Sequence, residues 1–289
     1  MKYEPGLGPP VAETLNRAPL LGRSMAFRRL LRGRVADGTL EDVAGEVAER
    51  YDEPLSSVRP LEADNWLSTP AVVNEDYFVK VITPRNSMLH ALLTTTRNLG
   101  VFSSGTEGFF EHVQTPVEMA EHELVATEGI RQLGVDAPDP LQAFEHEGLG
   151  VLVLEYLPAF EPLDSLDPTT VEAVAPELLA ALSRMHDAGL VHGDLRAENV
   201  LVADGDLYVI DATTVDEGAI EDARAYDLAC AIATLAPLVG PSRAVALAAE
   251  HYDDAALLAA EDYLDFVNIR PDHDFDAATI KGEIEHRVA

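Results

Sequence analysis

Lysine is nearly absent from this chain. It occurs only at Lys2, Lys80 and Lys281 among 289 residues, although lysine and arginine together number 20. The 51 acidic residues give a formal net charge of −31, and such a surface repels nucleic acids and anionic membranes in general. Excess acid with arginine in place of lysine is typical of a salt-adapted cytosolic protein, and we prefer this interpretation to an acidic surface made for one partner. The Debye length is about 3 Å at 1 M salt, so high salt would screen the self-repulsion.

Cysteine and long apolar runs are equally scarce. The single cysteine, Cys230, cannot form a disulfide within the chain and is expected to be a buried thiol. The longest apolar run, residues 228–240, is too short to span a bilayer. The opening residues, MKYEPGLGPP, lack the basic stretch and apolar core of a signal peptide. We therefore expect a soluble, cytoplasmic protein with no membrane contact.

Residues 1–50 predict an N-terminal helical extension. Two or three helices are expected over residues 11–50, broken at Gly22 and Gly38. The segment Arg23–Arg34, RSMAFRRLLRGR, holds five arginines and no acid. One interpretation is an amphipathic helix with a solvated basic face, and the other is a contact for RNA or an acidic partner. The pattern leaves both open.

The first half of the remaining chain is rich in strand signals. Residues 58–82 predict short strands, including a hairpin in which a turn at residues 74–76 joins AVVN to YFVKVIT. Residues 84–116 are rich in Ser, Thr and Gly and predict a loop. Residues 117–133 predict a helix, which Gly134 should end.

The second half is mainly helical. Residues 151–158, VLVLEYLP, predict a buried strand, and residues 170–189 a helix. Two short strands, VLVA and LYVID, should follow, and helices should dominate from Ala223 to about residue 266. The sequence therefore predicts an α+β fold of two lobes. An N-lobe over residues 51–157 would hold an antiparallel sheet and one helix, and residues 158–289 would form a mostly helical C-lobe.

Three side chains stand out in the segment LVHGDLRAENVLVADGDLYVID at residues 190–211, because each follows an apolar run or lies just inside one. They are Asp194, Asn199 and Asp211. An Asp beside a nucleophilic hydroxyl can orient it and accept its proton, while an Asn and a second Asp can supply the oxygen ligands that Mg²⁺ prefers. Phosphoryl transfer needs little beyond charge neutralisation and alignment. The spacing of the three residues is that of a kinase catalytic loop followed by a metal-binding Asp.

Lys80 is the second unusual residue. It lies in the strand-like segment YFVKVI and is the only lysine between residues 3 and 280. A lysine within an apolar strand is costly unless its ammonium group is paired. We expect the partner to be Glu123 of the following helix; Glu118 and Glu121 are alternatives, and all three carboxylates could instead be solvated.

These segments together resemble the protein-kinase-like fold, in its compact branch of RIO-type atypical serine/threonine protein kinases. The resemblance rests on YFVKV, EHELVATEGIRQLGVDAPDPL, LVLEYLP, HGDLRAEN, VIDAT and AYDLA, and it covers roughly residues 60–240. The acidic composition would make the chain an archaeal, halophile-like variant. The resemblance implies ATP as the cofactor, with Mg²⁺ as the metal ion and Mn²⁺ as the alternative.

The resemblance also implies how the nucleotide is held. Lys80 would pair with Glu123 and contact the α- and β-phosphates. Backbone groups of Glu155 and Leu157 would bind adenine, beside Leu154.

The resemblance assigns further roles around the catalytic loop. Asp194 would be the catalytic Asp, and Asn199 and Asp211 would hold metal. Asp227 would brace the loop from a helix. The histidines His186 and His192 are expected to be packing or capping residues, not bases.

Several features depart from ordinary protein kinases. Residues 62–73 contain no glycine where a glycine-rich phosphate loop should lie, and Asp211-Ala212-Thr213 replaces the DFG triplet. Only 15 residues separate Asp211 from Asp227, too few for a long activation loop. Arg196 stands where RIO-type kinases usually carry a small residue. It would either reach the γ-phosphate as a catalytic residue or offset nearby acids.

Three functions fit these observations. The first is a RIO-like ATP-dependent protein kinase or ATPase acting on a protein hydroxyl; the resemblance would allow a ribosome-assembly role, with Arg23–Arg34 as the only visible RNA contact. The second is a small-molecule phosphotransferase of the aminoglycoside or choline kinase type, although only 62 residues follow Asp227. The third is a kinase-like nucleotide-binding module with little turnover. We prefer the first, because the short segment after Asp227 leaves little room for the acceptor pocket of the second, and the intact set of polar residues argues against the third.

Overall fold

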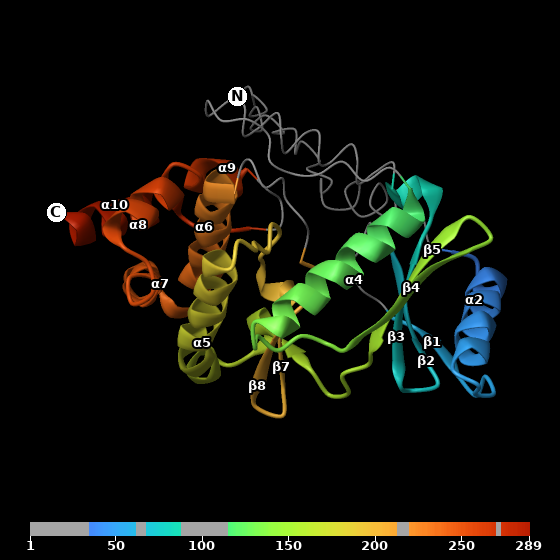
Figure 1. Ribbon diagram of the computed structural model, residues 1–289. Coiled ribbons are helices and arrows are strands. Elements are labelled where there is room, and N and C mark those ends of the chain that lie inside the picture. Colours follow the sequence, from blue (N-terminus) through green and yellow to red (C-terminus); the bar gives the residue numbers. More distant parts are fainter. Residues whose placement is uncertain (1–34, 62–67, 88–114, 213–219, 270–272) are drawn as a thin grey trace, which may run out of the picture. The chain divides into compact units, whose positions relative to one another are not determined.

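The structure, a computed structural model, describes residues 35–61, 68–87, 115–212, 220–269 and 273–289 (Figure 1). The helices expected before residue 35, including Arg23–Arg34, lie outside these residues. Residues 88–114 of the expected loop at 84–116 also lie outside them. Residues 84–87 are described and form a helical turn. The described part has the expected α+β composition, with an antiparallel sheet followed by a mostly helical remainder.

The first half of the fold is built on a five-stranded antiparallel sheet with the order β1-β2-β3-β5-β4. Its strands are β1 (Val58–Pro60), β2 (Thr69–Val73), β3 (Tyr77–Ile82), β4 (Pro140–His146) and β5 (Leu149–Glu155). The predicted hairpin is confirmed, since Val73 pairs with Tyr77 and Thr69 pairs with Val81. Strand β4 was not predicted, because Phe144 is its only buried residue and the strand shows no clear alternation.

Helices α2 (Asp37–Arg50) and α4 (Pro116–Gln132) cover different faces of this sheet (Figure 1). Leu40, Val43 and Val47 of α2 pack with Val79 and Val81 of β3. On the other face, Ala120 of α4 packs with Ile82, Leu152 and Leu154. Side chains alternate along a strand, so Lys80, between Val79 and Val81, faces α4.

The helix boundaries follow the sequence signals closely at α4 but not at α2. Gly134 has a φ of 70° and ends α4, as predicted. The break expected at Gly38 is wrong, because Gly38 lies in the first turn of α2, which begins at Asp37.

The second half consists of helices around a small sheet. The sheet has the order β6-β7-β8, and the helices follow in the chain. The elements are β6 (Glu161–Pro162), β7 (Val200–Ala203), β8 (Asp206–Val209), α5 (Pro168–Asp187), α6 (Ile220–Val239), α7 (Pro241–Ala248), α8 (Asp254–Glu261), α9 (Leu264–Asn268) and α10 (Ala277–Val288). Helix α6 is buried on all sides over much of its length, Cys230 included, and forms the centre of this core. The helical region therefore extends beyond residue 266, where the sequence pattern weakened.

No helix in the described ranges is both long enough and apolar enough to cross a membrane.

Candidate active site

A cavity of about 410 Å³ is lined by residues from both halves of the fold. Apolar side chains from the large sheet, from β7 and from the residue after β8 form much of its wall, among them Phe78, Leu154, Leu201 and Ile210. Charged and amide side chains join this wall, namely Lys80, Glu155, Arg196, Glu198, Asn199 and Asp211. A concave apolar pocket with a few convergent polar groups is the usual form of a small-molecule site.

Lys80 is the most constrained polar residue of the cavity. It is only 4% exposed, and its ammonium group donates to Glu123 Oε1 at 2.5 Å and to Asp211 Oδ1. Burial alone would lower the pKa of the Lys80 ammonium, but the two carboxylates outweigh burial and raise it. Lys80 is therefore charged throughout the working pH range. The pairing explains how an apolar strand tolerates a lysine.

The structure distinguishes Glu123 from the two alternative carboxylates on α4. Glu118 belongs to a capping box with Thr115 at the start of the helix, and Glu121 is exposed. Glu123 lies on the side of α4 that meets Lys80. Burial raises the pKa of the Glu123 carboxyl to about 7, against the lowering effect of Lys80.

Asp211 occupies an unusual backbone conformation just beyond β8. Its φ is 61°, in the left-handed region that non-glycine residues seldom adopt. The preceding residue, Ile210, donates its N–H to the Asn199 carbonyl at 3.0 Å and accepts a hydrogen bond from His192 Nε2 at 2.9 Å. Such conformations persist where surrounding contacts impose them, often at functional sites. Burial tends to raise the pKa of Asp211, but the charge and hydrogen bond of Lys80 leave it below its usual range.

The loop between α5 and β7 is held together by its own hydrogen bonds. Asn199 is 2% exposed, and its Nδ2 donates to the Asp194 carbonyl at 2.9 Å. The Asp194 N–H donates to His192 Nδ1 at 3.2 Å. Since His192 is buried and both of its ring nitrogens are engaged, it acts as a packing residue of the loop and not as a base.

The Asp227 carboxylate of α6 binds backbone N–H groups of the same loop. It is fully buried and accepts hydrogen bonds from the backbone N–H of His192 at 2.7 Å and from that of Gly193 at 3.0 Å, and its Oδ2 lies 3.0 Å from His186 Nε2. Gly193 has a φ of 77°, which a residue with a side chain would adopt only under strain. These bonds fix the backbone immediately before Asp194.

The remaining expected residues lie at or beside the cavity. Glu155 and Leu157 line it, and Glu155 Oε2 accepts the Asp139 N–H at 3.1 Å. Arg196 also lines it, with its Nε 3.7 Å from Asp194 Oδ2. Asp194 is not part of the lining and adjoins the cavity through Arg196.

Sequence reasoning missed one charged residue of the wall, Glu198. Its Oε2 lies 3.5 Å from Arg196 Nη1. Its position directly before Asn199 in the HGDLRAEN segment was the available signal.

Asn199 and Asp211 fit a role as magnesium ligands. Both line the cavity, and amide and carboxylate oxygens are ligands that Mg²⁺ accepts. The described residues include no group of three or more His, Cys, Asp or Glu side chains that could hold a metal ion by themselves. A site with one carboxylate and one amide suits Mg²⁺, which usually takes its other ligands from water and substrate phosphates.

Comparison with known proteins locates a family match on this part of the chain. The family model of the RIO domain matches residues 107–226. This range includes the loop of Asp194 and both ion-pair partners of Lys80, Glu123 and Asp211. The comparison with curated proteins found no match.

Solved structures resemble the chain remotely. The Rio2 kinase from Chaetomium thermophilum, solved as an ADP/Mg²⁺-phosphoaspartate complex, is 16% identical, with 92% of this chain and 85% of that chain covered and a TM-score of 0.45. A putative fructosamine-3-kinase from Haemophilus somnus is 11% identical, with coverages of 84% and 96% and a TM-score of 0.46. The PknI kinase domain of Mycobacterium tuberculosis is 16% identical, with coverages of 80% and 94% and a TM-score of 0.39. The family match is the finding that carries this comparison: the model of the RIO domain is similar to residues 107–226, which are 120 of the 289 residues.

Proposed function

We propose that the chain is an ATP-dependent phosphotransferase, a RIO-like serine/threonine protein kinase or ATPase. It would transfer the γ-phosphate of Mg·ATP to a protein hydroxyl or to water. The observation that carries this proposal is Lys80, buried between Glu123 and Asp211 on the wall of a cavity that also contains Asn199. Phosphate groups are stabilised by such a fixed ammonium, and phosphoryl transfer depends mainly on positioning and charge stabilisation.

The cavity supplies different surfaces for the two ends of the nucleotide. Phe78, Leu154 and Leu201 offer apolar surface for the adenine ring. Backbone groups of Glu155 and Leu157 would give its edge hydrogen-bond partners. Lys80 would contact the α- and β-phosphates while Glu123 keeps its ammonium in place.

Asn199 and Asp211 would hold the magnesium ion. The ion would supply charge neutralisation on the transferred phosphoryl group. The Asn199 side chain is oriented by its bond to the Asp194 carbonyl, so the amide oxygen points away from that bond and remains available as a ligand. A bound ion would also stabilise the left-handed conformation of Asp211.

Asp194 would act on the acceptor. Its carboxylate would orient the attacking hydroxyl and accept its proton. Arg196 lines the cavity, and its Nε lies 3.7 Å from Asp194 Oδ2. It would stabilise the γ-phosphate during transfer, as a third catalytic group beside Lys80 and Asp194.

Several finer assignments belong to the same proposal. The lobes would be residues 51–157 and 158–289, with residues 1–50 as an N-terminal extension, although α2 packs on the sheet. The protein would be cytoplasmic and adapted to high salt, and Mn²⁺ would replace Mg²⁺ in assays. An RNA or ribosome-assembly contact through Arg23–Arg34 stays a prediction from sequence.

The proposal is tested by γ-labelled ATP turnover in 0.15 M and 2 M KCl. The parent should release phosphate or label protein, and Asp194→Asn should lose at least about 100-fold in rate while still binding Mg·ATP, since general-base contributions are of this order. Asp211→Asn should weaken Mg·ATP binding itself. Asp206→Asn, a change at an exposed residue of β8, is the matched control. Equal turnover in all four proteins would show that the site is elsewhere.

The acceptor is found with the same assay. Label that appears on protein would establish a protein kinase. Label on aminoglycosides, choline or sugars would establish a small-molecule phosphotransferase instead. Binding of ATP with no turnover at either salt concentration would leave a nucleotide-binding module.

A further inference from the structure

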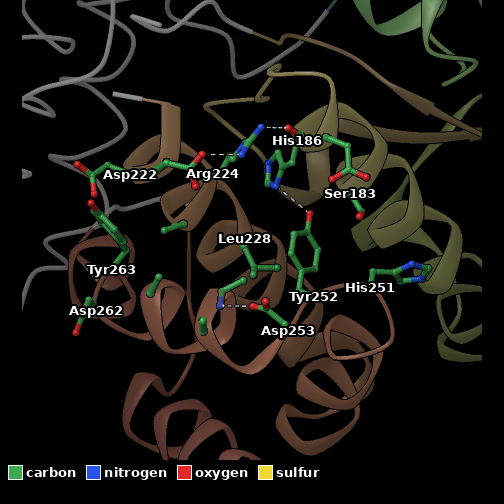
Figure 2. A pocket seen from close by; sticks show the side chains of 16 residues that line it. Ser183, His186, Asp222, Arg224, Leu228, His251, Tyr252, Asp253, Asp262 and Tyr263 are labelled. Atoms are coloured by element: carbon green, nitrogen blue, oxygen red, sulfur yellow. Dashed lines mark hydrogen bonds and ion pairs between the residues drawn. The ribbon is translucent and has the colours of Figure 1, made fainter. Parts of the chain in front are cut away.

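A second cavity, of about 940 Å³, opens in the helical half of the fold (Figure 2). It is lined by the end of α5, the start of α6, and α8 with the residues before it. His186 and Tyr252 stand on its wall with a dashed line between them in Figure 2. Neither residue belongs to the lining of the site proposed for the nucleotide.

A chain of side-chain hydrogen bonds leads from this wall to the loop that carries Asp194. The Tyr252 hydroxyl lies 3.0 Å from His186 Nδ1, and His186 Nε2 lies 3.0 Å from Asp227 Oδ2. Asp227 accepts the backbone N–H groups of His192 and Gly193. His186 is 4% exposed and Asp227 is fully buried, so water competes little for these bonds. The network therefore connects the cavity with the backbone of the two residues that directly precede Asp194.

The direction of the Tyr252 bond determines what His186 offers to Asp227. In a neutral imidazole one ring nitrogen donates and the other accepts. A phenol that donates to Nδ1 leaves the ring proton on Nε2, which then points at the Asp227 carboxylate. The opposite tautomer would place a lone pair against that carboxylate. A hydrogen bond on one nitrogen sets the tautomer at the other.

The surroundings keep the phenol protonated. Burial raises the pKa of Tyr252, and the negative charges of Asp227 and Asp187 raise it further, against a smaller opposing effect of Arg224. Arg224 also fixes the backbone at this point, because its Nη2 donates to the His186 carbonyl (Figure 2). Both the ring and the backbone of His186 are therefore held by residues of the cavity wall.

We propose that Tyr252 is a positioning residue for the catalytic loop, acting through the tautomer of His186 and the orientation of the Asp227 carboxylate. With Nε2 protonated, His186 fixes Oδ2 of Asp227, and the carboxylate holds the two backbone N–H groups that set the entry to Asp194. Without the Tyr252 hydroxyl, His186 can adopt the other tautomer and the carboxylate loses one of its three partners. The effect on turnover rests on the proposed function, whereas the effect on His186 and the loop backbone does not.

The test compares Tyr252→Phe with Tyr263→Phe. Tyr263 lines the same cavity and is buried, and its ring packs against Tyr226. Both changes remove one phenol oxygen, so the control matches the loss of a buried hydroxyl. The readouts are the ¹⁵N shifts of His186, the hydrogen exchange of the Gly193 amide, and kcat and KM for ATP.

The parent should show His186 protonated at Nε2. Tyr252→Phe should populate the Nδ1-protonated form and speed Gly193 exchange by about 3- to 10-fold, the factor that corresponds to one net hydrogen bond. Its kcat should fall by a similar factor while KM for ATP stays within about twofold, because the loop and not the nucleotide pocket is loosened. Tyr263→Phe should leave all three readouts near the parent values.

Two results would overturn the inference. One is a parent in which His186 carries its proton on Nδ1. The other is a folded Tyr252→Phe protein whose Gly193 exchange matches that of Tyr263→Phe. If Tyr252→Phe does not fold, the tautomer in the parent still decides. If the parent turns over no ATP, the proposed function fails, and the tautomer and exchange results still decide this inference.

Discussion

Replacing Lys80 with methionine removes a buried positive charge while preserving most of the side-chain volume. In the parent, the ammonium group lies between Glu123 and Asp211, whose side chains are 18% and 22% exposed. The variant leaves two carboxylates facing each other without a cation. Breaking a buried ion pair costs about 3–5 kcal/mol. Because both carboxylates retain some contact with solvent, we expect a loss of about 2–4 kcal/mol in the free energy of unfolding at pH 7.5.

The loss of unfolding free energy in Lys80→Met should depend on pH. The pKa shifts of Lys80, Asp211 and Glu123 determine whether that loss grows or shrinks as pH falls. Lys80 has a raised pKa, so its stabilising contribution is complete below its unfolded pKa and is lost only in strong alkali. Asp211 has a lowered pKa, so its contribution is present above its unfolded pKa and is lost as pH falls through the folded value. Glu123 has a pKa raised to about 7, so it contributes most below its unfolded pKa and loses that contribution as pH rises through 7.

At pH 5 Glu123 is therefore protonated, and it can share its proton with Asp211 when the lysine is gone. The cost of Lys80→Met should shrink to about 1–2 kcal/mol there, the price of one remaining buried charge with a hydrogen-bond partner. Urea unfolding at pH 5 and pH 7.5 measures both values. Lys281→Met is the matched control, since its partner Asp265 is 75% exposed and the pair contributes at most about 1 kcal/mol. Either of two results would refute the interaction of Lys80 with Glu123 and Asp211. One is a Lys80→Met protein that loses no more unfolding free energy than Lys281→Met, and the other is a loss that grows as pH falls.

Three further predictions follow from the packing, the cavity and the charge. Gly150→Ala should destabilise the protein by about 3 kcal/mol or more in thermal unfolding, because its Cβ would lie 2.0 Å from the backbone oxygen of Pro116, whereas Gly45→Ala on α2 has open space and should stabilise by up to about 1 kcal/mol. Leu154→Trp should fill the apolar end of the 410 Å³ cavity and weaken ATP binding at least about 10-fold in calorimetry, with an unchanged circular dichroism spectrum. The melting temperature should rise between 0.15 M and 2 M KCl, because screening relieves the repulsion of a net charge of −31, and a flat or falling curve would argue against salt adaptation.

The sequence predicted the elements around the site better than the partners within it. The segment YFVKVI is a strand by alternation, and that alternation alone puts Lys80 on the face opposite Val79 and Val81. The choice of Glu123 could not come from periodicity, because Glu118 and Glu121 occupy the same helix. Only the capping box at Thr115 and the exposure of Glu121 separate them, and both depend on where the helix begins and how it packs.

Other features depend on contacts between distant residues. Strand β4 is stabilised by pairing with β5, and its polar sequence gives little sign of this. Helix α10 lies beyond the last strong apolar pattern, yet Ile280 and Ile284 complete the core of the helical half. Tyr252 is 66 residues from His186 in sequence, so no local pattern could join them.

The local geometry gives a physical reason for a lysine at position 80 in a chain that has only three lysines. The ammonium group is compact and carries three donors, whereas the guanidinium of arginine is a larger planar fork suited to a single bidentate partner. In the space between β3, α4 and the end of β8, one donor reaches Glu123 and a second reaches Asp211. Under the proposed function, the third donor would contact a phosphate in the cavity, and the two carboxylates would fix its direction. An arginine would suit one of the two carboxylates better than both, and its wider head group would take part of the cavity that the proposed function assigns to the nucleotide. A chain that uses arginine almost everywhere else therefore has a lysine where two carboxylates and, under the proposed function, a phosphate meet at one point.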